Sequence, residues 1–433
     1  MKRKSNSKES CVADALNQIN EWNKHLSANL RKEKYKKMAQ SAYYFFRGTN
    51  FLFWKYIAND KRLNLFGSDK TKTWIQADLH AYNYGIYDNN NGDLVYGLND
   101  FDESCIADYQ FDLWRMAASM VLIAHENGFV DKEIIGSFIK SFTDSYLNIL
   151  EQYTHRGFEV LHEVTKENAF GKLDETLEQV ERKEGRQEML KQWTDGKNNG
   201  LTFDLSYHKL GSIPEGKMEE VRKAMSEYIG TLTKDVNEFN SDYFKVIDVA
   251  KRISSGTGSY GTPRYYILIE GEAQGKYNQR ILDAKLQYKP CAYRLLDENF
   301  QQKYDGRFIN EGQRHKEAYE SLNSSIDRHL GWIKLSEGIF SVRERSPFKS
   351  YFQATLLNTE TRFNKLAKQW GAILATAHIK ASSDFDVIKI IEQVAINKNQ
   401  LSELVSSVAF EYVDYNNIVF QNFINKLFLN ETS

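Results

Sequence analysis

Two polar stretches in the first quarter of the chain carry side chains suited to phosphoryl transfer. In residues 76–85, QADLHAYNYG, Asp78 precedes Asn83 by five positions, and in residues 99–103, NDFDE, Asp100 follows a hydrophobic run. Phosphoryl transfer needs a carboxylate that accepts the proton of the acceptor hydroxyl, and oxygen ligands that hold Mg²⁺ against the nucleotide phosphates. The types, order and spacing of these residues predict Asp78 as the base, and Asn83 and Asp100 as metal ligands.

The neighbouring polar residues have two possible roles each. Asp102 is either a second metal ligand or the partner of a cation, and His80 either contacts phosphate or acceptor or structures its loop. Asp112 lies at the start of an apolar helix. Its side chain either caps this helix or braces the loop that holds Asp78. Polar residues also close turns without any catalytic role. Because the two stretches occur together, each after a strand-like run, they favour a metal and phosphate site over plain turns.

A glycine-rich stretch in the second half, GTGSYG, places Gly256, Gly258 and Gly261 at GxGxxG spacing, with Ser259 among them. Dinucleotide-binding folds share this spacing, but there the chain continues from the glycines into a helix. Here it continues as TPRYYILIEG, a β-branched and aromatic run typical of a strand. Strand, glycine loop and strand indicate a phosphate cradle of the kinase type, and a hairpin loop without a ligand is the alternative.

A lysine follows one strand after the glycine loop. Lys285 ends the alternating part RILDAK of the run RILDAKLQY and is predicted to contact the α and β phosphates, in preference to Lys276 and Lys289. In kinases an acidic residue of the next helix pairs with this lysine. Glu311 in NEGQR is the first choice for that partner, ahead of two later glutamates of the same helix.

The elements that must position these residues predict an α+β protein. Helix-periodic runs alternate with a short hairpin near residues 72–101, and later β-branched runs predict a small antiparallel sheet. Residues 1–240 are expected to be mainly helical and to carry the catalytic and metal loops. Residues 241–347 are expected to form a nucleotide-binding sheet with the glycine loop, and residues 348–433 to complete the helical part.

The order of the motifs is the reverse of that in an ordinary kinase. A kinase chain begins with the glycine loop, the lysine and its acidic partner, and the catalytic loop follows later. Here the catalytic motifs come first. Circular permutation accounts for this order, because it preserves contacts while it changes the chain order, and two unrelated domains are the alternative.

The chain resembles the uncharacterised bacterial family called domain of unknown function 2252, a distant relative of protein-kinase-like and aminoglycoside phosphotransferase folds. The resemblance runs from about Lys37 to Asp384 and rests on AYYFFRGTN, QADLHAYNYG, NDFDES, FDLWRMAAS, GTGSYGTPRYYILIEG, NEGQR, LGW and AILATAHIKASSD. It implies a permuted, two-lobed kinase-like fold that binds ATP and Mg²⁺ through the residues named above. Ala77 stands where the phosphotransferases typically have Gly, and Leu286 follows the lysine where an acidic residue is expected. Arg47 of FFRG has no counterpart in kinases and either forms a salt bridge near the catalytic loop or contacts substrate.

These observations predict a phosphotransferase that acts on a small-molecule hydroxyl. Only about a dozen residues separate Asp100 from the helix of Asp112, whereas a protein kinase uses a longer segment there to hold a peptide. The alternatives are a nucleotide-binding pseudokinase, an AMP transferase, and a metal-dependent phosphohydrolase. The phosphohydrolase would use Asp78, His80, Asp100 and Asp102 and would not need the glycine loop.

Composition narrows the classes of partner and of cellular location that are expected for the protein. The 433 residues include 57 Lys and Arg against 58 Asp and Glu, which gives no overall charge that would attract nucleic acid or an anionic membrane. Three distant cysteines without CxxC spacing argue against a disulfide framework and a zinc site. The sequence shows neither a signal peptide nor an apolar run long enough to span a bilayer. We therefore expect a cytoplasmic protein whose partners are a nucleotide and an unknown acceptor.

Overall fold

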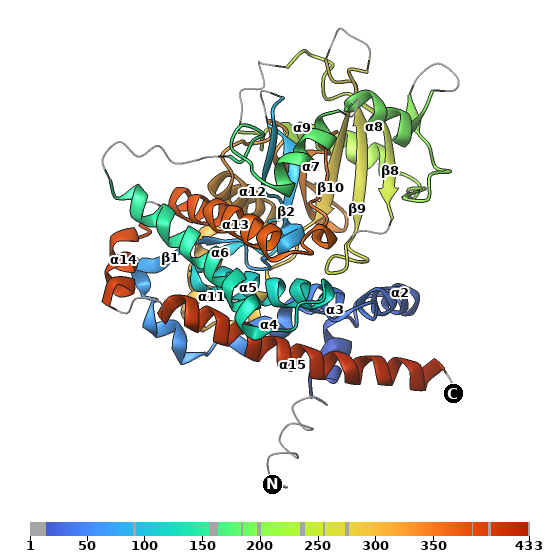
Figure 1. Ribbon diagram of the computed structural model, residues 1–433. Coiled ribbons are helices and arrows are strands. Elements are labelled where there is room, and N and C mark those ends of the chain that lie inside the picture. Colours follow the sequence, from blue (N-terminus) through green and yellow to red (C-terminus); the bar gives the residue numbers. More distant parts are fainter. Residues whose placement is uncertain are drawn as a thin grey trace.

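The computed structural model describes residues 14–89, 92–155, 163–182, 185–196, 201–233, 239–253, 256–272, 277–382, 384–396 and 400–431. Helices and small antiparallel sheets alternate along the chain, which confirms the expected α+β class. Figure 1 shows a helical body in the lower part of the view and a twisted sheet above it.

The centre of the helical body is α5 (Gln110–Glu126). Its residues from Gln110 to Ala124 are all buried, as expected for a helix that is surrounded on every side. α13 (Glu360–Ala381) packs along α6 (Lys132–Tyr153), and α15 (Gln400–Glu431) packs along α5. Other helices that contribute to the same core are α2 (Ala28–Met38), α3 (Ala42–Gly48), α4 (Asn50–Ile57), α7 (Lys172–Glu181), α10 (Cys291–Leu295), α11 (Glu298–Arg307), α12 (Glu311–Leu322) and α14 (Val387–Ile396).

The main sheet has six antiparallel strands in the order β11-β12-β10-β9-β8-β7. Their bounds are β7 (Leu210–Gly211), β8 (Val246–Arg252), β9 (Arg264–Ile269), β10 (Arg280–Leu286), β11 (Gly331–Leu335) and β12 (Gly338–Glu344). Alternation along β10 places Leu282, Ala284 and Leu286 on the apolar face that α9 (Lys217–Ile229) helps to cover. Asp283 and Lys285 therefore lie on the opposite face.

Two helices that precede the boundary expected at residue 240 belong to the main sheet and not to the helical body. α8 (Arg186–Trp193) and α9 pack on the main sheet, where Trp193 joins Tyr266 and Tyr228 joins Ile267 in two apolar clusters. The short pairing of β5 (Thr194–Asp195) with β6 (Thr202–Phe203) lies between these helices in the chain. Helical periodicity reveals that a helix buries one face, but it does not reveal which partner covers that face.

Two small pairings carry the polar stretches. β1 (Lys72–Ile75) pairs with β4 (Cys105–Asp108), and β2 (Tyr84–Asp88) pairs with β3 (Leu94–Leu98), both antiparallel. The expected hairpin is thus wrong in its pairing, since the strand before Asp78 pairs with the strand that follows Asp102. The two polar loops consequently leave this pair of strands at the same end.

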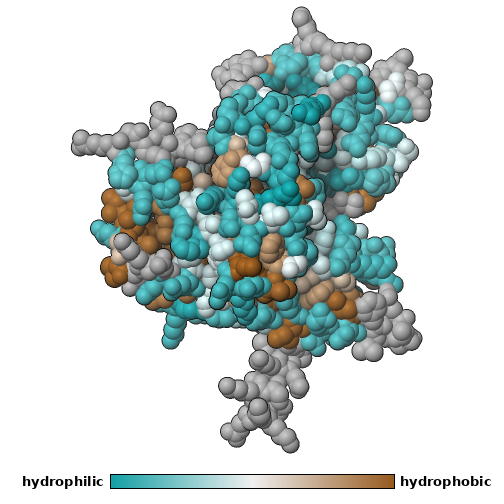
Figure 2. All heavy atoms as spheres, viewed as in Figure 1, coloured by the Kyte–Doolittle hydropathy of each residue, from teal (hydrophilic) through white to brown (hydrophobic). Residues whose placement is uncertain are grey.

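The visible surface is mostly hydrophilic, with apolar side chains gathered over α14 (Figure 2). Two of these side chains, Ile388 and Ile396, are 60% and 79% exposed. Among the described residues, no helix has the length and apolar character needed to cross a membrane.

Candidate functional site

The buried carboxylate of Asp112 fixes the loop that follows β1. Its oxygens accept the backbone N–H groups of Gln76 at 2.7 Å and Ala77 at 2.8 Å. The Ala77 carbonyl accepts hydrogen bonds from Asn50 and Trp54. These contacts hold Ala77 at φ +66°, a left-handed conformation that costs energy for any residue other than glycine. Of the two roles considered for Asp112, connection to the loop that holds Asp78 is the one that the hydrogen bonds show, and Ala77 adopts the conformation for which a glycine is suited.

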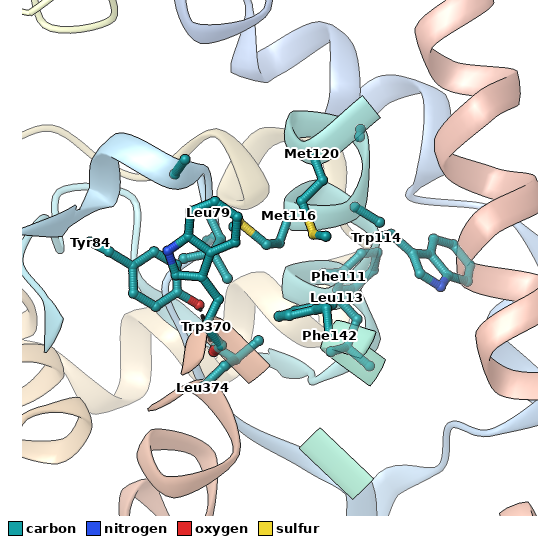
Figure 3. Packing of buried hydrophobic residues seen from close by; sticks show 14 of the residues in the cluster. Leu79, Tyr84, Phe111, Leu113, Trp114, Met116, Met120, Phe142, Trp370 and Leu374 are labelled. Atoms are coloured by element: carbon teal, nitrogen blue, oxygen red, sulfur yellow. Dashed lines mark hydrogen bonds between the residues drawn. The ribbon is translucent and has the colours of Figure 1, made fainter. Parts of the chain in front are cut away.

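Asp78 precedes a residue that is buried in the core, and its carboxylate lies beside a buried arginine. Leu79 is fully buried, and Figure 3 shows it near Met116 of α5 and the ring of Trp370. The Arg115 guanidinium lies 2.6 Å from the carboxylate of Asp78, which remains 17% exposed. Burial raises the pKa of Asp78 to about 7, although the charge of Arg115 opposes the rise. A carboxylate with such a pKa can take and release a proton near neutral pH.

Hydrogen bonds to backbone carbonyls join the two polar loops into one frame. Asn83 Nδ2 donates to the Asp78 carbonyl at 3.0 Å, and the Asn99 N–H donates to the Asn83 carbonyl at 3.1 Å. Gln76 Nε2 donates to the Asp100 carbonyl at 2.5 Å. The structure therefore brings together the three residues that the sequence predicts as base and metal ligands.

Two side chains of this frame have oxygen atoms with few hydrogen-bond partners. Within the described part of the chain, Asn83 Oδ1 accepts no hydrogen bond, and the Asp100 carboxylate accepts only the N–H of Asp102, at 3.4 Å. Asp100 also forms no ion pair with any described residue. Oxygen atoms of this kind are the ligands that Mg²⁺ prefers, so Asn83 and Asp100 fit the predicted metal role.

Asp102 forms an ion pair with Lys285 of β10. Gln287 Nε2 donates to the same carboxylate at 3.0 Å, and His315 Nε2 lies 3.8 Å from it. Burial is the largest single influence on the pKa of Asp102 and would raise it, but the charge of Lys285, the effect of His315 and the hydrogen bonds from Lys285 and Gln287 together hold the pKa below its usual range. The pKa of Lys285 is raised against the effect of burial by Asp100 and Asp102. Of the two roles predicted for Asp102, partner of a cation is the one that the structure has.

Glu311 is not the partner of Lys285, which corrects the prediction. Its carboxylate accepts hydrogen bonds from Tyr304 at 2.6 Å and from Arg314 Nε at 2.9 Å. Arg314 is fully buried and also donates to the carbonyls of Phe101 and Asp102. Glu311 thus orients an arginine that holds the loop of Asp102, because that arginine lies one helical turn away on α12.

The glycine loop connects β8 to β9, so the predicted order of strand, glycine loop and strand is confirmed. Gly261 has φ +86°, and a Cβ on Gly258 would lie only 3.1 Å from the Arg47 carbonyl. Lys34 Nζ donates to the Gly258 carbonyl at 3.0 Å, and burial lowers the pKa of Lys34 to about 8. The loop is therefore in direct contact with α2 and α3. Residues 254 and 255, which precede it, lie outside the described residues.

His80 is buried against the ring of Tyr43, with centroids 6.3 Å apart. Burial and then the charge of Arg47 hold the pKa of His80 well below its usual value, so the imidazole is neutral. Its carbonyl accepts the N–H of Asn83 at 2.8 Å. These contacts support the loop-structuring alternative for His80 over direct contact with a phosphate.

A polar cleft of about 370 Å³ adjoins the frame. Arg343 of β12 connects the two, since its guanidinium lines the cleft and donates to the Asn99 carbonyl at 3.0 Å. Burial, followed by the charges of Arg343 and Arg264, holds the pKa of Lys349 well below its usual value. Both acidic and basic side chains line the cleft, among them Asp88, Arg280, Asp283, Asp327, Glu344 and Arg345.

A family model described as "Uncharacterized protein conserved in bacteria (DUF2252)" matches residues 27–426. The chain belongs to the DUF2252 family. The match includes both polar loops, the glycine loop and Lys285, so every part of the candidate site lies inside the DUF2252 region. No curated protein and no solved structure matches the chain.

Sequence reasoning missed three cations of this DUF2252 site. Arg115 stands three residues after Asp112 on α5, so helical spacing could have identified it as a neighbour of the same loop. Arg314 lies in the NEGQR stretch, but only its hydrogen bonds to the carbonyls of Phe101 and Asp102 show that it holds a loop. Lys34 has no signal in the sequence, because its contact with Gly258 spans more than half of the chain.

Proposed function

We propose that this protein is an ATP- and Mg²⁺-dependent phosphotransferase of protein-kinase-like fold that acts on a hydroxyl of a small molecule. The observation that carries the proposal is the frame that holds Asp78, Asn83 and Asp100 together and extends through Asp102 to Lys285. These side chains correspond to the base, the metal ligands and the phosphate anchor of the kinase template. Turns that merely connect strands do not require all of these groups in one place.

The succession of strands supports the same template. β8, the glycine loop, β9 and β10 follow one another, and Lys285 lies on the third of these strands, as the kinase lysine does. Asp102 would orient Lys285 toward the phosphates, a task that a helix glutamate has in kinases. A circular permutation explains why the catalytic loops precede these strands in the chain.

Asp78 would act on the acceptor hydroxyl. In the transfer, the acceptor oxygen forms a bond to the γ-phosphorus, the bond from that phosphorus to the β–γ bridging oxygen breaks, and ADP leaves with the electron pair. The Asp78 carboxylate takes the proton that the hydroxyl loses. Arg115 holds this carboxylate in position, and its pKa of about 7 suits a group that must later release the proton.

Asn83 and Asp100 would hold the metal through their side-chain oxygens. When bound, Mg²⁺ neutralises the charge of the phosphate oxygens. Asp102 is engaged with Lys285, so we assign it to orientation of the lysine and no longer to the metal.

The connection between Asp100 and α5 supports a small acceptor. The chain passes from Asp100 through a short turn into β4, which leads directly to α5, whereas protein kinases use a longer segment to hold a peptide. The polar cleft beside Asn99 has a volume within the range of small-ligand sites. Its acidic and basic side chains suit a polar molecule.

Transfer of labelled phosphate tests the proposal. Wild-type protein is incubated with γ-labelled ATP, Mg²⁺ and a small-molecule extract of bacterial cells, and a labelled metabolite is expected. Asp78→Asn should lower the rate by about 100-fold or more, because it removes the general base. Its affinity for ATP should stay within about threefold of the wild-type value.

The matched control is Asp242→Asn, which replaces an exposed carboxylate that lies before β8 and far from the frame in the chain. This variant should transfer phosphate at the wild-type rate. Undiminished transfer by Asp78→Asn would contradict the proposal. Label that passes to protein from α-labelled ATP, with none in metabolites from γ-labelled ATP, would replace it with AMP transfer.

A further inference from the structure

Arg47 in the last turn of α3 has an unusual environment. Its guanidinium carbon lies 5.0 Å from the ring centroid of Tyr82, 5.7 Å from that of Tyr44 and 5.9 Å from that of Tyr43. Its Nε is buried without a hydrogen-bond partner. No carboxylate among the described residues forms an ion pair with Arg47. The side chain thus carries a positive charge that aromatic faces position and that no described anion neutralises.

Arg47 lies between the glycine loop and the catalytic loop. On one side, its carbonyl is the atom that a Cβ on Gly258 would approach within 3.1 Å. On the other side, its guanidinium contacts the ring of Tyr82, which belongs to the loop between Asp78 and Asn83, and its charge lowers the pKa of His80. The charges of Arg47 and Asp100 also act in opposite directions on the pKa of the Tyr351 hydroxyl. Arg47 therefore approaches the glycine loop through its backbone and the catalytic loop through its side chain.

A second contact fixes this geometry. Lys34 of α2 donates a hydrogen bond to the Gly258 carbonyl, and Lys37 lies 4.6 Å from the ring centroid of Tyr260 in the same loop. α2 and α3 therefore keep the glycine loop and Arg47 at a constant separation. Arg47 belongs to α3, and Lys34 of α2 holds the Gly258 carbonyl. The Arg47 guanidinium therefore needs little rearrangement to meet an anion bound at the glycine loop.

Arg47 is partly exposed, but its Nε is buried without a partner, and a buried polar atom without a hydrogen bond is unfavourable unless the protein uses it. Aromatic faces attract a cation, but they leave the N–H donors of the guanidinium unsatisfied. Those donors form a planar fork that matches the oxygens of a phosphate group. The environment of Arg47 is thus prepared for an anion that the frame and the glycine loop also contact.

We infer that Arg47 binds the terminal phosphate of the nucleotide and neutralises the charge that phosphoryl transfer places on it. The inference rests on the proposed function and extends it, because the kinase template contains no residue that corresponds to Arg47. Arginines that GTPases use for this task show that such a cation can raise the rate strongly. A cation that contacts the terminal phosphate also makes ATP bind more tightly than ADP.

Nucleotide titrations test this role. Dissociation constants of ATP and ADP, each with Mg²⁺, are measured by calorimetry for the wild type, Arg47→Met and Arg47→Lys. Arg47→Met should weaken ATP binding by about tenfold or more, while ADP binding changes less than about twofold. Arg47→Lys keeps the charge but not the planar fork, so its dissociation constant for ATP should lie between those of the wild type and Arg47→Met. The matched control, Arg222→Met, alters an exposed arginine of α9 and should bind both nucleotides normally.

Each outcome decides between specific ideas. If the wild type binds neither nucleotide, the proposed function fails. If the wild type binds both and Arg47→Met leaves the ratio of the two constants unchanged, or weakens both equally, the role of Arg47 is structural and the inference is overturned. Thermal melting without nucleotide shows whether Arg47→Met is folded. If Arg47→Met is not folded, the ratio of the ATP and ADP dissociation constants is taken from Arg47→Lys instead.

Discussion

Opposing influences act on the carboxylate of Asp78. Burial raises its pKa most, and the charges of Glu103 and Asp100 act in the same direction, whereas the charge and hydrogen bonds of Arg115 lower it. The balance leaves the pKa at about 7. At this value the group is charged in part of the molecules at neutral pH and can still lose a captured proton to water.

Phosphoryl transfer should therefore rise with pH through about 7. Below that pH the Asp78 carboxylate is protonated and cannot accept the hydroxyl proton, and above it the carboxylate is charged and active. Arg115→Met removes the charge that lowers the pKa of Asp78, so the pH of half-maximal rate should move upward. The measurement is the rate at saturating substrate between about pH 5 and 9. A rate independent of pH in the wild type would rule out Asp78 as the base.

At the level of elements, the sequence predicted strands better than it predicted their partners. The β-branched runs of β9 and β10 identified two strands and the loop before them, because their pattern depends on neighbouring residues alone. The pairing of β1 with β4 joins residues that lie on either side of β2 and β3, so no local pattern reveals it. The sequence could group Asp78, Asn83 and Asp100 because their spacing is set within short loops, and their roles as base and metal ligands stay predictions.

The partner of Lys285 was beyond the reach of the sequence. Glu311 and Asp102 are both acidic and both far from the lysine in the chain, and only the packed structure distinguishes them. In the structure, Arg314 reaches Glu311 within one helical turn, while the loop of Asp102 lies against the end of β10. α12 therefore supports the site indirectly, through the loop that Arg314 holds.

Double-mutant cycles on the free energy of unfolding can establish this division of roles. The pair Lys285→Met and Asp102→Asn should show a coupling energy of about 1–3 kcal/mol, since the two side chains form an ion pair that is largely buried. The pair Lys285→Met and Glu311→Gln should be additive within about 0.5 kcal/mol. Denaturant unfolding gives the energies. Coupling in the second cycle but not in the first would restore Glu311 as the partner.

At the scale of the whole molecule, the candidate site draws on segments that are distant in the chain. The frame belongs to the helical body, the glycine loop and Lys285 belong to the main sheet, and α2 and α3 contact the glycine loop. The sequence could not predict this last contact, because nothing in the composition of α2 marks Lys34 as the donor to Gly258. A ligand bound here would touch both the helical body and the main sheet.

Nucleotide binding should consequently stabilise both parts together. ATP with Mg²⁺ at about 100 times its dissociation constant raises the free energy of unfolding by about 2.7 kcal/mol if it binds only the folded protein. Hydrogen exchange locates the effect: backbone N–H groups of residues 99–104 and of residues 256–272 should exchange more slowly with nucleotide, and those of α14 should not change. Asp100→Asn should weaken the protection in the presence of Mg²⁺, because it removes a metal ligand. Protection confined to the main sheet would mean that the nucleotide does not reach Asn83 and Asp100, and the frame would then need another explanation than phosphoryl transfer.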